Sequence, residues 1–122
     1  MAEEKKFVII SPSFMFDEKN WDSRRSYHYP SVWSGKALLQ IVNKLRNKYE
    51  LHITKFYLFG FSAGAQFVLR FALWKPDFCA ACVAYGSGGR IIPIKWVNVS
   101  FFIGIGLLDT ASRIKKSREF YQ

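Results

Sequence analysis

Lys55-Phe-Tyr-Leu-Phe-Gly-Phe-Ser-Ala-Gly-Ala65 decides the fold of this 122-residue chain. The apolar run at residues 56–59 predicts a buried strand, and the apolar residues that recur over 65–72 predict a helix. Between them, Gly60-Phe-Ser-Ala-Gly64 fits G-x-S-x-G, a motif that places a serine on a sharp turn from strand to helix. The stretch therefore predicts a strand–turn–helix unit with Ser62 at the turn.

A serine in such a turn has the surroundings that a nucleophile needs. Ser62 is expected to adopt strained backbone dihedrals that project its hydroxyl above the sheet, with glycines on either side because larger residues would collide. The helix beginning at Ala63 would aim its free N–H groups and the positive end of its dipole at the same spot. The Ala63 N–H is thus a candidate oxyanion donor. The alternative is an ordinary strand–helix turn without chemistry.

The rest of the chain alternates strands with helices. This order is typical of a parallel sheet with right-handed crossovers. We predict the α/β class, with a parallel sheet of about four strands, flanking helices and a single domain over residues 1–122. Strands are expected at residues 7–10, 56–59, 80–85 and 97–105, and helices at 32–49, 63–75 and 110–121.

Composition and charge exclude several classes of protein. Half of the residues are apolar and 18% are aromatic, which is too apolar for a disordered chain. No apolar run approaches the roughly 18–20 residues that span a bilayer, and the first, at 7–10, is too short for a secretory signal. We therefore expect a cytoplasmic protein without membrane contact.

The net charge is +9, and eight of the 18 basic residues form two groups on predicted helices or their ends: Lys44, Arg46, Lys48 and Lys55, and Arg113, Lys115, Lys116 and Arg118. We interpret them as solvated helix faces. The alternative is a polyanion-binding face, but no recognition-helix, zinc-finger or RNA-binding motif accompanies it, so we expect no nucleic-acid partner.

Two cysteines, Cys79 and Cys82, form an isolated C-x-x-C pair in a predicted strand. A structural zinc site needs two more ligands, and the histidines, His28 and His52, lie far upstream. We interpret the cysteines as small buried hydrophobic residues, with redox or metal chemistry as the alternative, and expect neither a metal nor a cofactor.

Three stretches of the chain together resemble a known family: residues 55–65, Lys75-Pro-Asp-Phe78 and Phe101-Phe-Ile-Gly-Ile-Gly-Leu-Leu-Asp-Thr110. They resemble the α/β-hydrolase superfamily, with the polyhydroxybutyrate-depolymerase, feruloyl-esterase and dienelactone-hydrolase-like branches most similar. The resemblance implies a serine esterase or acyl hydrolase with Ser62 as nucleophile, acting on a small-molecule ester or acyl substrate without a cofactor.

The resemblance also suggests a triad acid. In the family, an Asp that follows the strand two beyond the nucleophile strand has this role, and Asp109 occupies that place. We therefore expect Asp109 at the same edge of the sheet as Ser62. The alternative is that Asp109 caps the last helix.

The sequence departs from the family in its histidines. The family order is Ser, acid, His, but no histidine follows Ser62. His52 enters the nucleophile strand from the wrong edge, while His28 lies on the correct side in the wrong chain order and is a candidate substitute base. Because an unassisted serine hydroxyl is hardly ionised, we expect a weak or inactive hydrolase.

The resemblance therefore implies an incomplete α/β-hydrolase core, truncated at both ends, that lacks the N-terminal strands and the last strand with the catalytic histidine. If the first strand moves to fill the resulting gap, Ser13 or Phe14 would offer a second oxyanion N–H. Open sheet edges favour a homodimer that pairs through them. The competing hypothesis is a non-catalytic α/β-hydrolase-like scaffold that serves as a binding or interaction module.

Overall fold

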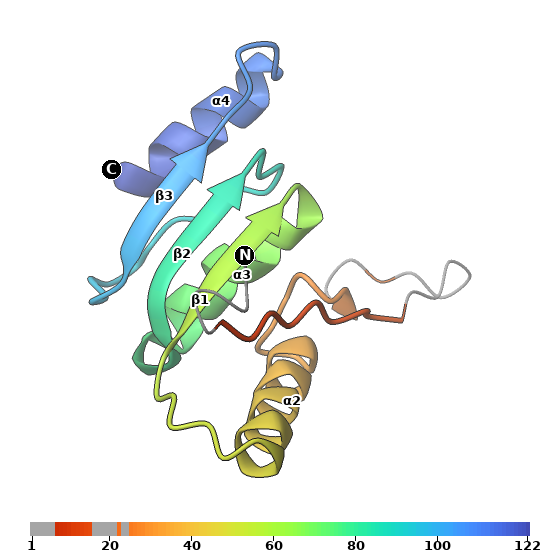
Figure 1. Ribbon diagram of the computed structural model, residues 1–122. Coiled ribbons are helices and arrows are strands. Elements are labelled where there is room, and N and C mark those ends of the chain that lie inside the picture. The colour runs from red at the N-terminus through yellow and green to blue at the C-terminus, as the bar shows by residue number, and fades with distance from the viewer. Residues whose placement is uncertain (1–6, 16–21, 23–24) are drawn as a thin grey trace.

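The computed structural model describes residues 7–15, 22 and 25–122. Its centre is a parallel sheet of three strands in the order β1-β2-β3 (Figure 1). This arrangement confirms the predicted α/β class, with strand and helix bounds close to those expected. The elements are α2 (Ser34–Lys48), β1 (Phe56–Phe61), α3 (Ala63–Trp74), the 3-10 turn η2 (Pro76–Phe78), β2 (Cys79–Tyr85), β3 (Ser100–Gly104), α4 (Ala111–Arg118) and the 3-10 turn η3 (Glu119–Tyr121).

The strand expected at residues 7–10 is wrong. This segment forms no ladder with the sheet, and Phe7, Val8 and Ile9 are exposed. A short apolar run forms a strand only when a neighbouring strand pairs with it, because an isolated strand leaves its backbone groups unpaired. Ile10 and Phe14 pack instead against the core. The first strand therefore does not move over to fill a gap in the sheet.

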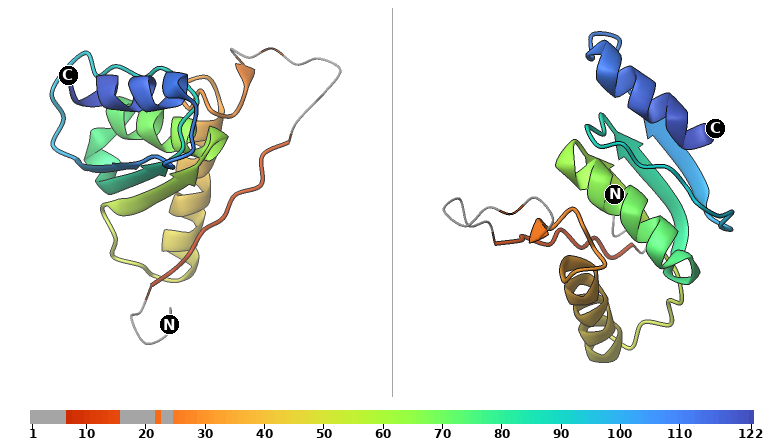
Figure 2. Two further views of the ribbon diagram at one scale, coloured as in Figure 1. Left: turned by 90° about the horizontal axis from the view of Figure 1, so that it is seen from above. Right: turned by 180° about the vertical axis from the view of Figure 1, so that it is seen from behind.

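One face of the sheet is covered by helices. Both α3 and α4 lie on the same side of the sheet, while α2 stands beside β1 (Figure 2). Along β1, Leu58 and Gly60 are buried on the α3 side, whereas Tyr57, Phe59 and Phe61 are exposed on the other. This alternation is the period of two that a strand imposes when one of its faces is covered.

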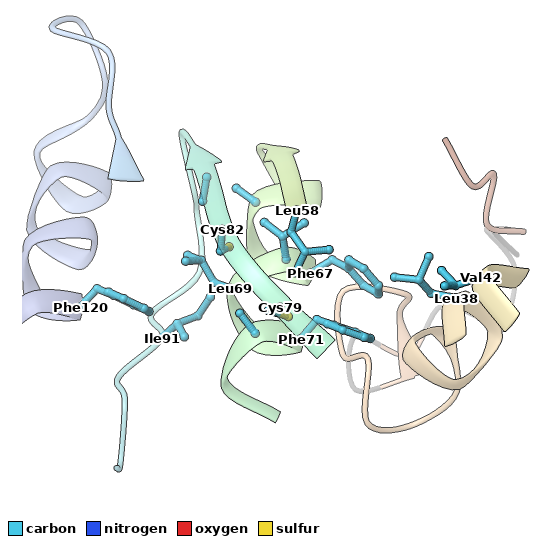
Figure 3. Close-up of a cluster of buried hydrophobic side chains, with 14 residues drawn as sticks. Leu38, Val42, Leu58, Phe67, Leu69, Phe71, Cys79, Cys82, Ile91 and Phe120 are labelled. Carbon is cyan, nitrogen blue, oxygen red and sulfur yellow. The ribbon is translucent and has the colours of Figure 1, made fainter. Parts of the chain in front are cut away.

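The core lies between the sheet and α3 (Figure 3). Phe71 is fully buried at its centre, and its truncation to alanine would cost about 3–5 kcal/mol. A bulge where Phe56 pairs with Cys79 and Tyr57 with Ala81 brings Cys79 and Cys82 to the same buried face, although they are three residues apart.

The helices follow from the sequence pattern and its stop signals. Leu38 and Val42, one turn apart, form the buried stripe of α2. By contrast, α3 is apolar on most of its surface and ends before Pro76, which cannot continue a helix. No helix in the described part of the chain is both long and apolar enough to cross a membrane.

Candidate active site

Ser62 lies at the turn between β1 and α3, as the motif predicts. Its backbone has φ 54° and ψ −113°, a region that residues with a side chain rarely adopt. Holding a residue there costs on the order of 1–3 kcal/mol. The Ser62 N–H donates to the carbonyl oxygen of Tyr85 at 2.9 Å, so the ladder between β1 and β2 continues into the turn and fixes it.

The Ser62 hydroxyl does not cap the helix that follows it. A serine before the first turn of a helix usually has an extended backbone and accepts a hydrogen bond from an N–H of that turn. Here the side chain makes no such bond, and the residue is half-buried. The Ser62 hydroxyl is therefore not used to cap α3.

Backbone N–H donors at the start of α3 lie next to Ser62. The first N–H groups of any α-helix have no partner within the helix. Ala63 is the first residue of α3, and Gln66 N–H makes the first helical bond, to Ser62 O at 3.3 Å. The Ala63 N–H, adjacent to Ser62, therefore has the place that an oxyanion donor needs.

Asp109 lies at the same edge of the sheet as Ser62, as expected. Phe61, Tyr85 and Gly104 share a row at the carboxyl ends of the three parallel strands. Ser62 follows that row directly, and Asp109 follows it in the turn that leads to α4. The strand β2 separates β1 from β3, which puts their axes about 10 Å apart.

The Asp109 side chain already has two contacts. Its Oδ2 accepts from the Gly106 N–H at 2.9 Å, and its Oδ1 lies 3.6 Å from Nη1 of Arg113. The alternative that Asp109 caps the last helix is wrong. Thr110 is the cap, because its Oγ1 accepts from the Arg113 N–H at 3.4 Å. Asp109 instead closes the turn before the helix.

Sequence reasoning missed two polar side chains near this edge. Gln66, in the first turn of α3, and Arg113, in the first turn of α4, both approach Gly88 in the loop after β2. Arg113 thus places a cation beside both Asp109 and the loop after β2. Its place three residues after the capping threonine is the only signal in the sequence, and it does not distinguish Arg113 from other basic residues of α4.

His28 belongs to a loop that is tied to α3. Its Nδ1 lies 2.8 Å from Ser26 Oγ, and its carbonyl oxygen accepts from Arg70 Nη1 at 3.0 Å. The Arg70 guanidinium also stacks on the ring of Tyr29, 4.2 Å from its centroid. Burial, together with the positive charge of Arg70, lowers the pKa of His28. These contacts hold the loop and do not involve Ser62.

His52 and a cavity beside α2 lie away from the edge of the sheet that holds Ser62. His52 is exposed in the segment before β1, a full strand length from Ser62. The cavity, of about 240 Å³, opens at that far edge too, between α2 and the start of β1. Within the described residues, no three His, Cys, Asp or Glu side chains gather as a metal site would require.

The cysteines have the properties of core residues. Burial raises the pKa of both Cys79 and Cys82 to about 12, and both thiols are free. The Cys79 thiol donates to the carbonyl oxygen of Lys75 at 3.5 Å. Because the thiolate is the reactive form, thiols with so high a pKa are inert at neutral pH.

Aromatic residues in the loop that precedes α2 pack on one another and on α3. The ring of Phe14 stacks on Tyr27 at 5.3 Å and contacts Trp33 at 5.6 Å and Phe67, on α3, at 5.5 Å. These rings join the core rather than the turn at Ser62. Two other aromatic residues of this loop, Phe16 and Trp21, lie outside the described residues.

The chain is similar to part of one named esterase. It is 30% identical over 89 residues to a probable acetylxylan esterase A from Aspergillus clavatus, a match that covers 71% of this chain and 29% of that protein. The chain therefore spans less than a third of the length of this relative. No protein-family model matches the chain, and no solved structure matches it significantly. The similarity supports an esterase-like relationship.

Proposed function

We propose that this chain carries the nucleophile side of a serine esterase site of the α/β-hydrolase type. Ser62 is the nucleophile, the Ala63 N–H stabilises the oxyanion and Asp109 is the acid of the triad. The proposal rests on the conformation of Ser62. Its φ of 54° is strained, and its hydroxyl makes no capping hydrogen bond that would offset the free-energy cost of this strain. Strain of this kind clusters at functional sites.

The reaction would be acyl transfer to serine. Ser62 Oγ attacks the acyl carbon of an ester and passes its proton to a base, while the negative charge on the carbonyl oxygen faces the Ala63 N–H. The bond to the alcohol then breaks, the alcohol leaves with the proton, and water hydrolyses the acyl-enzyme. Since the relative is named for acetyl esters, acetyl esters are the first substrates to test.

The contacts of His28 with Ser26 and Arg70 tie it to its own loop, and His52 is exposed in the segment before β1, so we assign neither as the base. An imidazole both takes the serine proton and returns it to the leaving group, and loss of one triad member leaves only about 10³–10⁴-fold catalysis over water. We therefore expect the 122-residue chain to be a weak ester hydrolase by itself.

Imidazole added in solution tests this proposal. A fluorophosphonate probe reacts with an activated serine, forming an Oγ–P bond and releasing fluoride while the proton goes to the base. Peptide mass spectrometry should locate the label on Ser62, at a rate that rises with the imidazole concentration. Without imidazole, labelling should be slow.

Two variants complete the experiment. Ser62→Ala should abolish the imidazole-dependent label, and Ser112→Ala, at an exposed position of α4, should leave it unchanged. If imidazole promotes no label on Ser62 in the folded chain, the esterase proposal fails. The competing hypothesis, a non-catalytic scaffold that serves as a binding module, would then stand.

A further inference from the structure

The uncovered face of the sheet carries three rows of side chains. The register places Tyr57, Ala81 and Ser100 in the first row at the same level across the strands. Residues that are paired in a parallel sheet point to the same side, so each row lies on one face. The other rows are Phe59, Val83 and Phe102, and then Phe61, Tyr85 and Gly104.

Aromatic rings dominate this face, which we call the aromatic face. Tyr57, Phe59 and Phe61 are 70–75% exposed, Phe102 is 56% exposed and Tyr85 is 38% exposed. The rings contact one another across the strands, with centroids 6.2 Å apart for Phe59 and Tyr85 and 5.7 Å apart for Tyr85 and Phe102. The aromatic face is thus continuous from β1 to β3.

This face is at the upper end of, or above, the size of the largest apolar patch on a typical monomer. Fully accessible aromatic side chains present about 150–250 Å² each, so at these exposures the five rings present roughly 500–800 Å². The largest apolar patch of a typical monomer is about 300–600 Å², and one partner of a standard protein interface buries about 800 Å². The aromatic face therefore has about the area that one side of a stable dimer needs.

Charge points to the same conclusion. The chain has a net charge of +9, so two identical copies repel wherever their basic surfaces meet. None of the residues in the three rows is charged. Because the aromatic face lacks charges, two copies can approach through it without direct like-charge contacts.

We propose that the aromatic face binds the same face of a second copy of this chain, in a two-fold symmetric dimer. Two such sheets would pack face to face about 10 Å apart, as the sheets of a β-sandwich do. Beside the large aromatic residues of β1, the small residues Ala81 and Ser100 make the surface lower. This difference in height allows the side chains of two such faces to interdigitate. The proposal uses the sheet face and leaves the strand edges free, and it does not depend on Ser62.

Sedimentation velocity over a range of concentrations tests the dimer. Wild type should sediment with twice the mass of the 14.2 kDa chain. Phe59→Lys and Phe102→Lys each place an ammonium group on each side of the interface, where burying an unpaired charge is unfavourable. Each should weaken dimerisation about 100-fold or more. Tyr49→Lys removes an exposed aromatic residue at the end of α2 and should leave the dimer intact.

Nitration of tyrosines provides a test on the unmodified protein. In the dimer Tyr57 should be protected while Tyr49 reacts, and dilution to the monomer should expose Tyr57. Circular dichroism checks that the lysine variants remain folded, as expected for substitutions at exposed positions.

Three results would overturn the proposal. The first is a wild-type monomer at about 100 µM with Tyr57 reactive. The second is a monomer in which Tyr57 is nevertheless protected, since another part of the chain would then cover the face. The third is a dimer that survives both lysine substitutions, which would place the interface at a strand edge.

Discussion

A side chain on Gly60 would collide with the carbonyl group of Gly64. An added Cβ at Gly60 would lie under 3.0 Å from the backbone of Gly64, closer than real Cβ atoms approach. An added Cβ at Gly64 would meet nothing within 4 Å. The sequence-based expectation that both glycines avoid collisions is therefore correct for Gly60 and wrong for Gly64.

The first prediction compares alanine at these two positions. Gly60→Ala should lower the free energy of unfolding by about 2–3 kcal/mol, because the contact is with backbone, which cannot move aside. Gly64→Ala should be neutral or should stabilise by up to about 1 kcal/mol, because alanine is favoured over glycine in a helix. Urea unfolding of both variants measures the difference. Equal destabilisation would contradict the geometry of the turn.

The second prediction concerns backbone strain. Ser62 and Glu50 are the described non-glycine residues with positive φ, at 54° and 51°. Ser62→Gly should be more stable than Ser62→Ala by about 1 kcal/mol, since glycine relieves the strain while alanine keeps it. Urea unfolding measures this as well.

Glu50 is the control for this prediction. It follows the end of α2, where glycine is the usual residue, so Glu50→Gly should stabilise by a similar amount without affecting the labelling of Ser62. If Ser62→Gly and Ser62→Ala have the same stability, Ser62 is not strained.

The order of the elements was predictable because local signals determine it. The glycines around Ser62 and the proline at Pro76 mark where β1 ends and α3 stops, whatever the rest of the chain does. Residues 7–10 have as strong a local strand pattern, yet form no strand. Pairing with a neighbouring strand is a tertiary interaction, and the pattern of one segment does not contain it.

The third prediction concerns pH. Burial raises the pKa of Cys79 and Cys82 from 9.0 to about 12. The unfolded thiols ionise from about pH 9 upward whereas the folded ones stay protonated, so the unfolded state binds fewer protons in this range. The stability present below pH 9 should therefore fall as pH rises from 9 to 12, by about 1.4 kcal/mol per pH unit for each thiol.

Urea unfolding at several pH values measures this slope. Other groups also titrate in this range, so the control is the double variant Cys79→Ala/Cys82→Ala. This variant should be less stable than wild type at pH 8, and its free energy of unfolding should fall less steeply as the pH rises. Iodoacetamide at pH 8 should alkylate neither thiol in the folded wild type. Rapid alkylation there would show that the thiols are not buried.

The candidate site was predictable in part, for a physical reason. Ser62 belongs to a motif of adjacent residues, so the sequence alone places it. Asp109 could be assigned to an edge of the sheet from strand order, but its partners could not, because Gly106 and Arg113 approach it only through the conformation of one turn. The approach of Gln66 to the loop after β2 depends on how α3 packs, which no local pattern records.

The last prediction separates a structural role of Asp109 from a catalytic one. Asp109→Ala removes the acceptor of the Gly106 N–H and should cost about 1 kcal/mol of unfolding free energy. Asp109→Asn keeps an acceptor oxygen, and the lost pairing with the half-exposed Arg113 is worth little, so its stability should stay within about 0.5 kcal/mol of wild type. Labelling of Ser62 with added imidazole should nevertheless be about tenfold slower or more in Asp109→Asn, because a neutral amide cannot stabilise the imidazolium that forms. Urea unfolding and peptide mass spectrometry on the same samples give both values. A stable Asp109→Asn variant whose Ser62 is labelled as fast as in wild type would assign Asp109 to closing the turn before α4 and remove it from the triad.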